Sequence, residues 1–310
     1  MSATIARTLA GAIALQEISE SWRLDAELML AEAIGRRREW LLAHSDESLE
    51  VSVLARYREM FERRLKGEPL AYIIGRKGFM ELELAVNAAV LIPRPETELL
   101  VEWVLETLGH AENLPGFEGG KEAGREENGA ATEPLRLADL GTGSGAIALA
   151  LASARPRWRF EAVDVDVGAL AVARSNAQTL GLRNVDFTQA SWCSSLAALS
   201  FDAVVSNPPY VADSDPHLQA AGLEYEPTLA LAAGAQGMDC LREIVVQARR
   251  VLKRGGWLFL EHGFDQQQTL LSMLSAKGYE DVQGRRDYSG VDRMVAGRWT
   301  GRGVGGRESR

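Results

Sequence analysis

Short apolar runs alternate with helical segments from about residue 135 to residue 263, and this alternation constrains the fold more than any other feature. The runs that predict strands are LRLADLG, FEAVDVD, VDFTQA, FDAVVSN and GWLFLEHG. The segments that predict helices are GAIALALASA, VGALAVARSNAQTLG and MDCLREIVVQARRVLKRGG, and the last two are expected to end at Gly181 and at Gly255–Gly256. Strands this apolar cannot face water, so the pattern predicts an α/β fold with an open parallel sheet covered by helices on both faces.

The chain before this region changes composition twice. Residues 1–75 are rich in Ala, Leu, Glu and Arg at helical spacing, which predicts a small helical domain. Residues 76–94 alternate apolar and polar side chains around Asn87, the pattern of two short strands, and we expect them to form a β-hairpin linker. A helix is then expected to begin with Pro95 near its first turn.

The α/β domain is expected to span residues 95–300 and to contain one segment that does not fold. Residues 110–134 are rich in Gly and charged side chains and poor in apolar ones, so they cannot repay the entropy cost of ordering and are expected to be a disordered insertion. The tail at 301–310 is expected to be flexible for the same reason.

Composition limits the partners and the compartment. The 310 residues carry a formal charge of −9, so no overall positive surface is available for a nucleic-acid backbone, and direct nucleic-acid binding is not expected. The two cysteines and four histidines form no metal-ligand pattern, so no metal is expected, and such cysteine usage is typical of the reducing cytoplasm. No stretch approaches the ~20 apolar residues of a membrane span.

The loop after the first predicted strand, DLGTGSGA, has Gly141, Gly143 and Gly145 at alternate positions. Glycines at this spacing let the backbone turn sharply from strand to helix and approach a ligand closely. In open α/β sheets ligands bind beyond the carboxyl ends of the strands, where this loop is expected. Two other interpretations stay open here: a tight turn without a ligand, and a dinucleotide fingerprint formed by Gly141, Gly143 and Ala146.

The loops after the second and third predicted strands carry Asp164 and Trp192. A carboxylate at a strand end can accept hydrogen bonds from both hydroxyls of a ribose, so Asp164 indicates a nucleoside, which NAD, FAD and S-adenosylmethionine all contain. The alternative role for Asp164 is a helix cap, which Asp166 could fill as well. Trp192 would lie over an adenine bound in this way, or would only pack against the core.

The fourth predicted strand ends in VVSNPPYV, where the prolines stop the sheet because neither can donate an N–H. Methyl transfer to a planar nitrogen would give each following residue a role. The side-chain oxygen of Asn207 and the main-chain carbonyl of Pro208 would each accept one N–H, which directs the nitrogen lone pair toward the methyl group and stabilises the positive charge that develops. Pro208 and Pro209 would fix that carbonyl, and Tyr210 offers a flat face to the planar group.

With these loops, several further motifs resemble one known family. They are IPRPETE, SWC, DPHL, EYEP, LEHG and RDYSG, and the resemblance covers roughly Leu70 to Arg298 apart from the insertion. The chain resembles the release factor glutamine methyltransferases, which use S-adenosylmethionine to methylate the side-chain nitrogen N5 of a glutamine, in a GGQ-type loop, of class 1 peptide chain release factors. NPPY alone is shared with methylases of adenine in DNA and of other amines, whereas the full set of motifs is much more specific.

The resemblance implies a fold and a set of site residues. The fold is a Rossmann-like class I methyltransferase domain with a mostly parallel seven-stranded sheet, preceded by a helical substrate-recognition domain. Cofactor contacts are implied for Gly141, Thr142, Gly143, Ser144, Gly145, Asp164, Trp192 and Asn207. Contacts with the glutamine are implied for Asn207, Pro208, Pro209 and Tyr210, with catalytic roles for Asn207, Pro208 and Tyr210. S-adenosylhomocysteine is the implied product, and a cytoplasmic monomer is expected.

Two other functions compete with glutamine methylation. One is N6-adenine methylation of DNA or RNA by the same Asn-Pro-Pro-Tyr wall, and the other is a non-catalytic or dinucleotide-binding Rossmann protein. Net acidity disfavours the first, because duplex binding draws heavily on phosphate contacts. The presence of Asn207 disfavours the second. Because the wall reads only a primary amide, selectivity must come from outside the pocket, and residues 1–75 are expected to dock the release factor.

Overall fold

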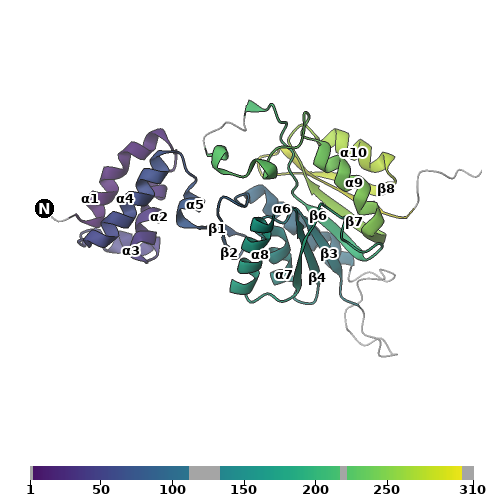
Figure 1. Ribbon diagram of the computed structural model, residues 1–310, viewed down its shortest axis with the longest axis horizontal. Helices are drawn as coiled ribbons and strands as arrows, with labels where there is room; N and C mark the ends of the chain where they lie inside the picture. The colour runs from purple at the N-terminus through teal and green to yellow at the C-terminus, as the bar shows by residue number, and fades with distance from the viewer. Residues whose placement is uncertain (1–2, 112–132, 217–221, 302–310) are drawn as a thin grey trace, which may run out of the picture.

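The computed structural model describes residues 3–111, 133–216 and 222–301. A helical domain lies at one end of the molecule and a larger α/β domain at the other, with helix α5 and a short hairpin between them (Figure 1). Most of the predicted insertion at 110–134 lies outside the described residues, apart from its two ends, and so does the tail after Gly301. The expectation that these segments are disordered therefore stays a prediction.

The N-terminal domain is helical, as predicted. Its elements are α1 (Ile5–Ala10), the 3₁₀ helix η1 (Gly11–Glu17), α2 (Trp22–Ile34), α3 (Arg38–Ala43), α4 (Val51–Leu65) and α5 (Leu70–Ile74). They enclose a core of their own, whose largest fully buried side chains are Ile5, Leu15, Met29, Leu30 and Leu41. The buried Asp25 carboxylate accepts a hydrogen bond from Arg64 Nε at 2.9 Å, which ties α2 to α4.

The hairpin strands β1 (Arg76–Phe79) and β2 (Leu82–Ala85) pair antiparallel. The hairpin turns at Met80 and Glu81, so the prediction of two strands around Asn87 had the turn too late in the sequence. The reason is tertiary: the main-chain N–H of Met80 donates to Glu98 Oε1 at 2.8 Å, which anchors this turn to the first turn of the next helix.

Seven strands form one sheet in the α/β domain. They are β3 (Arg136–Leu140), β4 (Arg159–Asp164), β5 (Val185–Gln189), β6 (Phe201–Ser206), β7 (Leu252–Glu261), β8 (Tyr279–Arg286) and β9 (Asp292–Trp299). Their order is β5-β4-β3-β6-β7-β9-β8, and β9 is the one strand that runs opposite to the other six. The predicted mostly parallel, seven-stranded sheet is therefore confirmed. The strand order reverses between β3 and β6, and in such sheets this reversal opens a crevice for a ligand.

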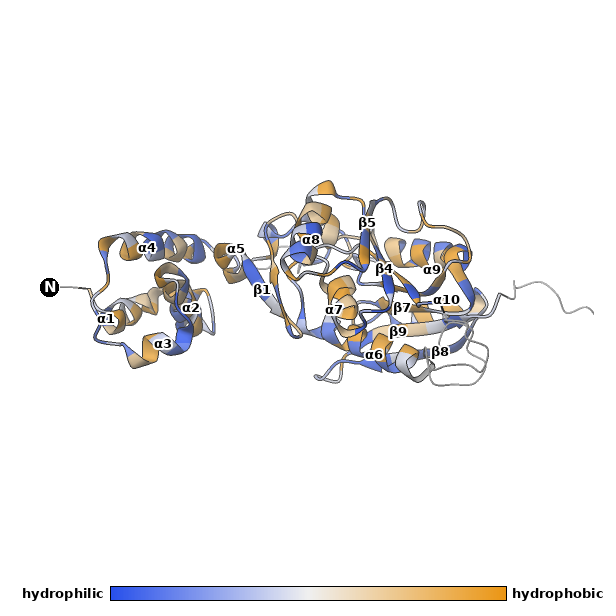
Figure 2. Ribbon diagram, turned by 90° about the horizontal axis from the view of Figure 1, so that it is seen from below, coloured by the Kyte–Doolittle hydropathy of each residue, from blue (hydrophilic) through white to orange (hydrophobic). Residues whose placement is uncertain are grey.

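Helices cover both faces of the sheet. One face packs against α6 (Pro95–Ala111), α7 (Ala146–Ala154) and α8 (Val167–Thr179), and the other against α9 (Asp239–Val251) and α10 (Gln267–Ala276). Figure 2 shows α7 as hydrophobic over nearly its whole length, because it is buried against both the sheet and the neighbouring helix α6. Helix α6 begins at Pro95, as predicted, since a missing N–H costs nothing in a first turn.

Helix α9 ends at Val251, four residues before the predicted stop at Gly255. Leu252 already has extended backbone angles, is fully buried and pairs with Phe201 of β6. Lys253 Nζ also lies 2.9 Å from Asp202 Oδ2, which fixes the start of β7 to β6. Burial of Leu252 in the sheet thus outweighs the helical pattern of the sequence.

The Asn176 side chain on α8 joins the hairpin to the glycine loop. Its Nδ2 donates to the carbonyls of Ala85 at 3.0 Å and of Ser144 at 2.9 Å, and its Oδ1 accepts from the N–H of Ala85 at 2.8 Å.

Among the residues that the structure describes, no helix is long and apolar enough to cross a bilayer.

Candidate active site

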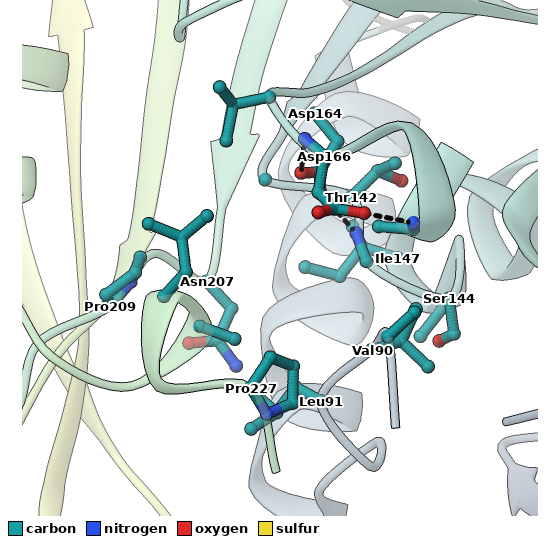
Figure 3. Close-up of a pocket in the computed structure, with 18 of the residues that line it drawn as sticks. Val90, Leu91, Thr142, Ser144, Ile147, Asp164, Asp166, Asn207, Pro209 and Pro227 are labelled. Atoms are coloured by element: carbon teal, nitrogen blue, oxygen red, sulfur yellow. Dashed lines mark hydrogen bonds between the residues drawn. The ribbon is translucent and has the colours of Figure 1, made fainter. Parts of the chain in front are cut away.

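A cavity of about 460 Å³ lies beyond the carboxyl ends of β3, β4, β5 and β6. Asn207 and Pro209 form one side of it, and Thr142, Asp164 and Asp166 lie across from them (Figure 3). The lining is completed by Ala88–Leu91, Pro93, Arg94, Thr97, Gly141, Gly143, Ser144, Ala146, Ile147, Val165, Ala169, Ala190–Trp192, Pro227, Leu229 and Ala230. Most of the residues predicted for the site are thus brought together in one cavity.

The glycine loop turns from β3 into α7. Gly141, Gly143 and Gly145 have φ angles of 69°, 54° and 86°, a region that L side chains rarely adopt. A Cβ at Gly145 would lie 2.8 Å from a methyl group of Leu149, so this position also needs glycine for packing. Residues 141–144 line the cavity, whereas Gly145 caps the start of α7 and does not line it.

The Asp139 side chain, on β3, holds the glycine loop in place through hydrogen bonds. Its Oδ2 accepts hydrogen bonds from Thr142 Oγ1 at 2.6 Å and from the N–H of Ala148 at 3.1 Å. Complete burial raises the pKa of Asp139 to about 7. In the sequence Asp139 is the first letter of the glycine-loop motif and was assigned no role, although a carboxylate inside an apolar strand itself indicates that it supports a neighbouring loop.

Asp164 lies at the end of β4, in the cavity wall. Its Oδ2 accepts from the N–H of Gly143 at 2.9 Å and its Oδ1 from the N–H of Asp166 at 3.0 Å. Burial raises its pKa, and these hydrogen bonds oppose the shift. The helix cap of α8 is Asp166, which accepts from the N–H of Ala169, so the alternative role considered for Asp164 is filled by its neighbour.

Trp192 follows β5 and lies between the core and the cavity. Its ring lies over the glycine loop, where a Cβ on Gly141 would meet it at 3.5 Å. One part of the side chain packs against the core, and another lines the cavity. Its Nε1 donates to Glu243 Oε2 at 3.2 Å, which helps to fix the plane of the ring.

The Asn-Pro-Pro-Tyr wall follows β6. Asn207 and Pro209 line the cavity, Pro208 is buried, and Tyr210 lies half-buried beside the core under α9 and α10. Asn207 Nδ2 donates to Thr97 Oγ1 at 3.0 Å. Tyr210 donates its hydroxyl to Glu261 Oε1 at 3.2 Å, so the polar end of this ring is already occupied.

Behind the wall, Thr97 and Glu261 form a buried pair. Thr97 Oγ1 donates to Glu261 Oε2 at 2.7 Å, and both side chains are nearly inaccessible to water. Burial raises the pKa of Glu261 to about 7, against the opposing effects of Thr97, Tyr210 and Arg293. The motifs that contain these residues, IPRPETE and LEHG, contribute to the family resemblance, but neither residue was predicted to have a role in the site.

Another buried carboxylate, Glu226, holds two of the loops that line the cavity. Glu226, from the EYEP motif, accepts from Arg94 Nη2 at 2.6 Å and from the N–H of Ile92 at 3.1 Å. The next residue, Pro227, lines the cavity (Figure 3). The pair therefore fixes the loop after β6 against the loop before α6.

Within the described part of the chain, no cluster of His, Cys, Asp and Glu is arranged to hold a metal ion.

Known proteins resemble the chain in sequence and in fold. Family models match residues 9–75, as the PrmC N-terminal domain, and residues 130–222, as the methyltransferase small domain. The release factor glutamine methyltransferase of Coxiella burnetii is 43% identical over 284 residues, which cover 92% of this chain and 94% of that protein. The enzyme of the same name from Escherichia coli is 40% identical over 288 residues, covering 93% of this chain and 96% of that protein.

A solved structure supports the fold alone. The catalytic domain of hMettl16, crystallised in complex with MAT2A 3'UTR hairpin 6, superposes with a TM-score of 0.53 at 19% identity, over 79% of this chain and 83% of that chain. Identity to the curated relatives is more than twice as high and extends over nearly their whole length. The chain belongs to the release factor glutamine methyltransferase family.

Proposed function

We propose that this protein transfers a methyl group from S-adenosylmethionine to the side-chain amide nitrogen of a glutamine in class 1 peptide chain release factors. The observation that carries the proposal is the direction of the Asn207 amide. Its Nδ2 is engaged by Thr97, so its Oδ1 is the end left to accept an N–H from a bound group. Asn207 lines the same cavity as the glycine loop, and curated relatives are named for this activity.

The residues of the cavity fit S-adenosylmethionine. A volume of about 460 Å³ lies within the range of roughly 300–1,000 Å³ typical of small-molecule sites. The space beside Gly143 is open, since an added Cβ would meet no atom within 4 Å. The two oxygens of Asp164 accept the N–H groups of Gly143 and Asp166, a carboxylate has further lone pairs for a ribose hydroxyl, and Trp192 offers an aromatic face in the same wall.

The wall then makes a poor nucleophile reactive. An amide nitrogen attacks slowly because its lone pair is delocalised into the adjoining carbonyl. When bound, S-adenosylmethionine supplies an electrophilic methyl group and leaves as S-adenosylhomocysteine. Asn207 Oδ1 and the carbonyl of Pro208 accept the two N–H groups of the glutamine, which holds the nitrogen in line with the methyl group and can contribute about 7–11 kcal/mol. The same acceptors stabilise the positive charge that develops on nitrogen.

Tyr210 presents a ring rather than a base. Burial raises the pKa of its hydroxyl, with the nearby Glu261 carboxylate adding to the rise, so the phenol stays protonated at neutral pH. Its proton is donated to Glu261. Tyr210 thus acts by holding the planar amide of the glutamine. The methylated nitrogen carries one proton too many and is strongly acidic in that form, so it releases this proton to water, and no strong base is needed in this mechanism.

The helical domain supplies the selectivity for the release factor. The cavity is lined from residue 88 onward, so residues 1–75 are available for contacts with the body of a protein substrate. Their separate core lets them present a stable surface without taking part in the sheet. Because its substrate acts in translation, we place the protein in the cytoplasm. N6-adenine methylation is not favoured, since the curated relatives are named for glutamine.

A labelling experiment tests the proposed function. The purified protein is incubated with methyl-labelled S-adenosylmethionine and either a purified class 1 release factor, the same factor with its loop glutamine replaced by Ala, or duplex DNA. We expect label in the unmodified factor only. Label in DNA, or equal label in both forms of the factor, would contradict the proposal.

A further inference from the structure

We propose that Thr97 and Glu261 are positioning residues that fix the direction of the Asn207 amide in the catalytic wall. This inference rests on the proposed function, because it explains how the wall presents an acceptor, and not a donor, to the amide nitrogen of the substrate. It assigns roles to two buried side chains that lie outside the Asn-Pro-Pro-Tyr motif.

The three side chains form a chain of hydrogen bonds from the core to the cavity. Glu261, the last residue of β7, is 1% exposed, and its Oε2 accepts from Thr97 Oγ1 at 2.7 Å. Thr97, in the first turn of α6, is 4% exposed and accepts from Asn207 Nδ2 at 3.0 Å. Both bonds lie within the ordinary range for O–H···O and N–H···O geometry.

The direction of this chain follows from the number of protons on a hydroxyl. Thr97 has one O–H, and it gives that proton to Glu261. Only lone pairs of Oγ1 then face Asn207, so the group that faces Thr97 must be a donor. An Asn side chain meets this condition only with Nδ2 toward Thr97. Its carbonyl oxygen is consequently the end offered to a ligand.

Glu261 also holds the other end of the wall. Its Oε1 accepts from the Tyr210 hydroxyl at 3.2 Å, so one carboxylate receives a proton donor from each side. An ionised carboxylate can only accept hydrogen bonds, and it therefore orients both hydroxyls at once. Of the charged groups near Glu261, Arg293 favours this ionised form and Glu96 opposes it.

Without Thr97 the Asn207 amide has no preferred direction. A rotation of 180° about its last bond would turn Nδ2 toward the substrate nitrogen, and two N–H groups would then face each other. Such a site neither holds the substrate nor stabilises positive charge on it. Thr97 and Glu261 thus supply the orientation of the Asn207 amide, which the presence of the amide does not provide by itself.

Thr97→Val tests the inference, because it removes the hydroxyl and keeps the branched shape. Single-turnover methylation of the release factor, at saturating S-adenosylmethionine, is expected to fall about tenfold or more, with the affinity for S-adenosylmethionine unchanged within about twofold. Thr97→Ser keeps the hydroxyl and should recover most of the rate. Thr188→Val is the matched control, since Thr188 donates to Glu161 at 3.0 Å between β4 and β5, away from the wall.

Two further measurements separate orientation from a structural role. If Thr97 acts through Asn207, then adding Thr97→Val to Asn207→Ala should not lower the methylation rate further. A structural defect caused by Thr97→Val would lower the rate of the double variant below that of Asn207→Ala. The side-chain amide signals of Asn207 in ¹⁵N NMR should shift in Thr97→Val and not in Thr188→Val. This measurement does not depend on catalytic activity. Unchanged amide signals, or a parent-like rate in Thr97→Val, would overturn the inference. If the parent protein does not methylate the release factor, but the Asn207 amide signals still shift in Thr97→Val, the proposed function is overturned and the inference on orientation stands.

Discussion

Replacing Glu261 by Gln measures how much stability the protein loses by keeping an ionised carboxylate behind the Asn-Pro-Pro-Tyr wall. Burial raises the pKa of Glu261 from 4.5 to about 7, and the hydrogen bonds from Thr97 and Tyr210 offset only part of this effect. Glutamine has nearly the same shape and stays neutral at every pH. The variant should therefore be more stable than the parent protein where Glu261 is ionised, and nearly equal to it where Glu261 is protonated.

The sign and the size of this effect follow from proton linkage. Between pH 4.5 and pH 7 the unfolded chain has released the Glu261 proton that the folded protein still holds, so the folded state loses stability as the pH rises. Above pH 7 both states are ionised and the loss stays constant. A pKa change of one corresponds to about 1.4 kcal/mol, so the parent protein loses roughly 2–3 kcal/mol from this residue between pH 5 and pH 8.

Urea denaturation of both proteins at pH 5 and pH 8 measures the difference directly. The free energy of unfolding of Glu261→Gln, relative to the parent, should rise by about 2–3 kcal/mol between these two pH values. Glu161→Gln is the control, because Glu161 also accepts a hydrogen bond from a threonine but is only half-buried. Methylation should nevertheless slow in Glu261→Gln, since a neutral amide cannot accept from both hydroxyls. A relative stability that does not change with pH would refute the reasoning.

Three further changes test the site and the helical domain that we propose to dock the substrate. Asn207→Ala should lower turnover at least ~10²-fold in single-turnover assays and change cofactor affinity much less, since it removes one preorganised polar contact; normal turnover would exclude the acceptor mechanism. Asp164→Ala should weaken S-adenosylmethionine binding by about 1.5–3 kcal/mol in calorimetry, and NADH should not bind to the parent protein; an unchanged affinity would remove Asp164 from the site. Deleting residues 1–75 should leave S-adenosylmethionine binding nearly intact and abolish methylation of the intact release factor, whereas a full-length rate would place recognition in the α/β domain.

Much of the fold could be predicted because its signals are local. The apolar runs of β3 to β7 and the helical spacing between them identify the parallel sheet, and Pro95 marks the start of α6. The two errors have tertiary causes. Glu98 anchors the hairpin turn at Met80, and burial of Leu252 against β6 ends α9 early. Neither contact can be read from residues that are close in the sequence.

The candidate site likewise contains residues that could be predicted from local sequence and residues whose contacts are long-range. Gly141, Asp164, Trp192 and Asn207 lie at or just beyond the carboxyl ends of strands, where residue type and position together indicate a ligand, and all four line the cavity. The supporting carboxylates were not assigned roles, because a lone Glu in a motif gives no sign of its partner. Glu226 illustrates this, since it meets Arg94 across a separation of 132 residues.

Sheet topology explains why the residues that orient Asn207 meet despite separations of 110 and 164 residues. Strands β6 and β7 are parallel neighbours in which Ser206 pairs with Leu260, so the residue after each of these, Asn207 and Glu261, emerges at the same edge of the sheet. Helix α6 precedes β3 and runs back across the sheet, so its first turn, with Thr97, lies at this edge too. The end of α6 at Ala111 and the start of β3 at Arg136 lie at the opposite edge of the sheet, so the segment between them is attached far from the hydrogen bonds that hold the Asn207 amide.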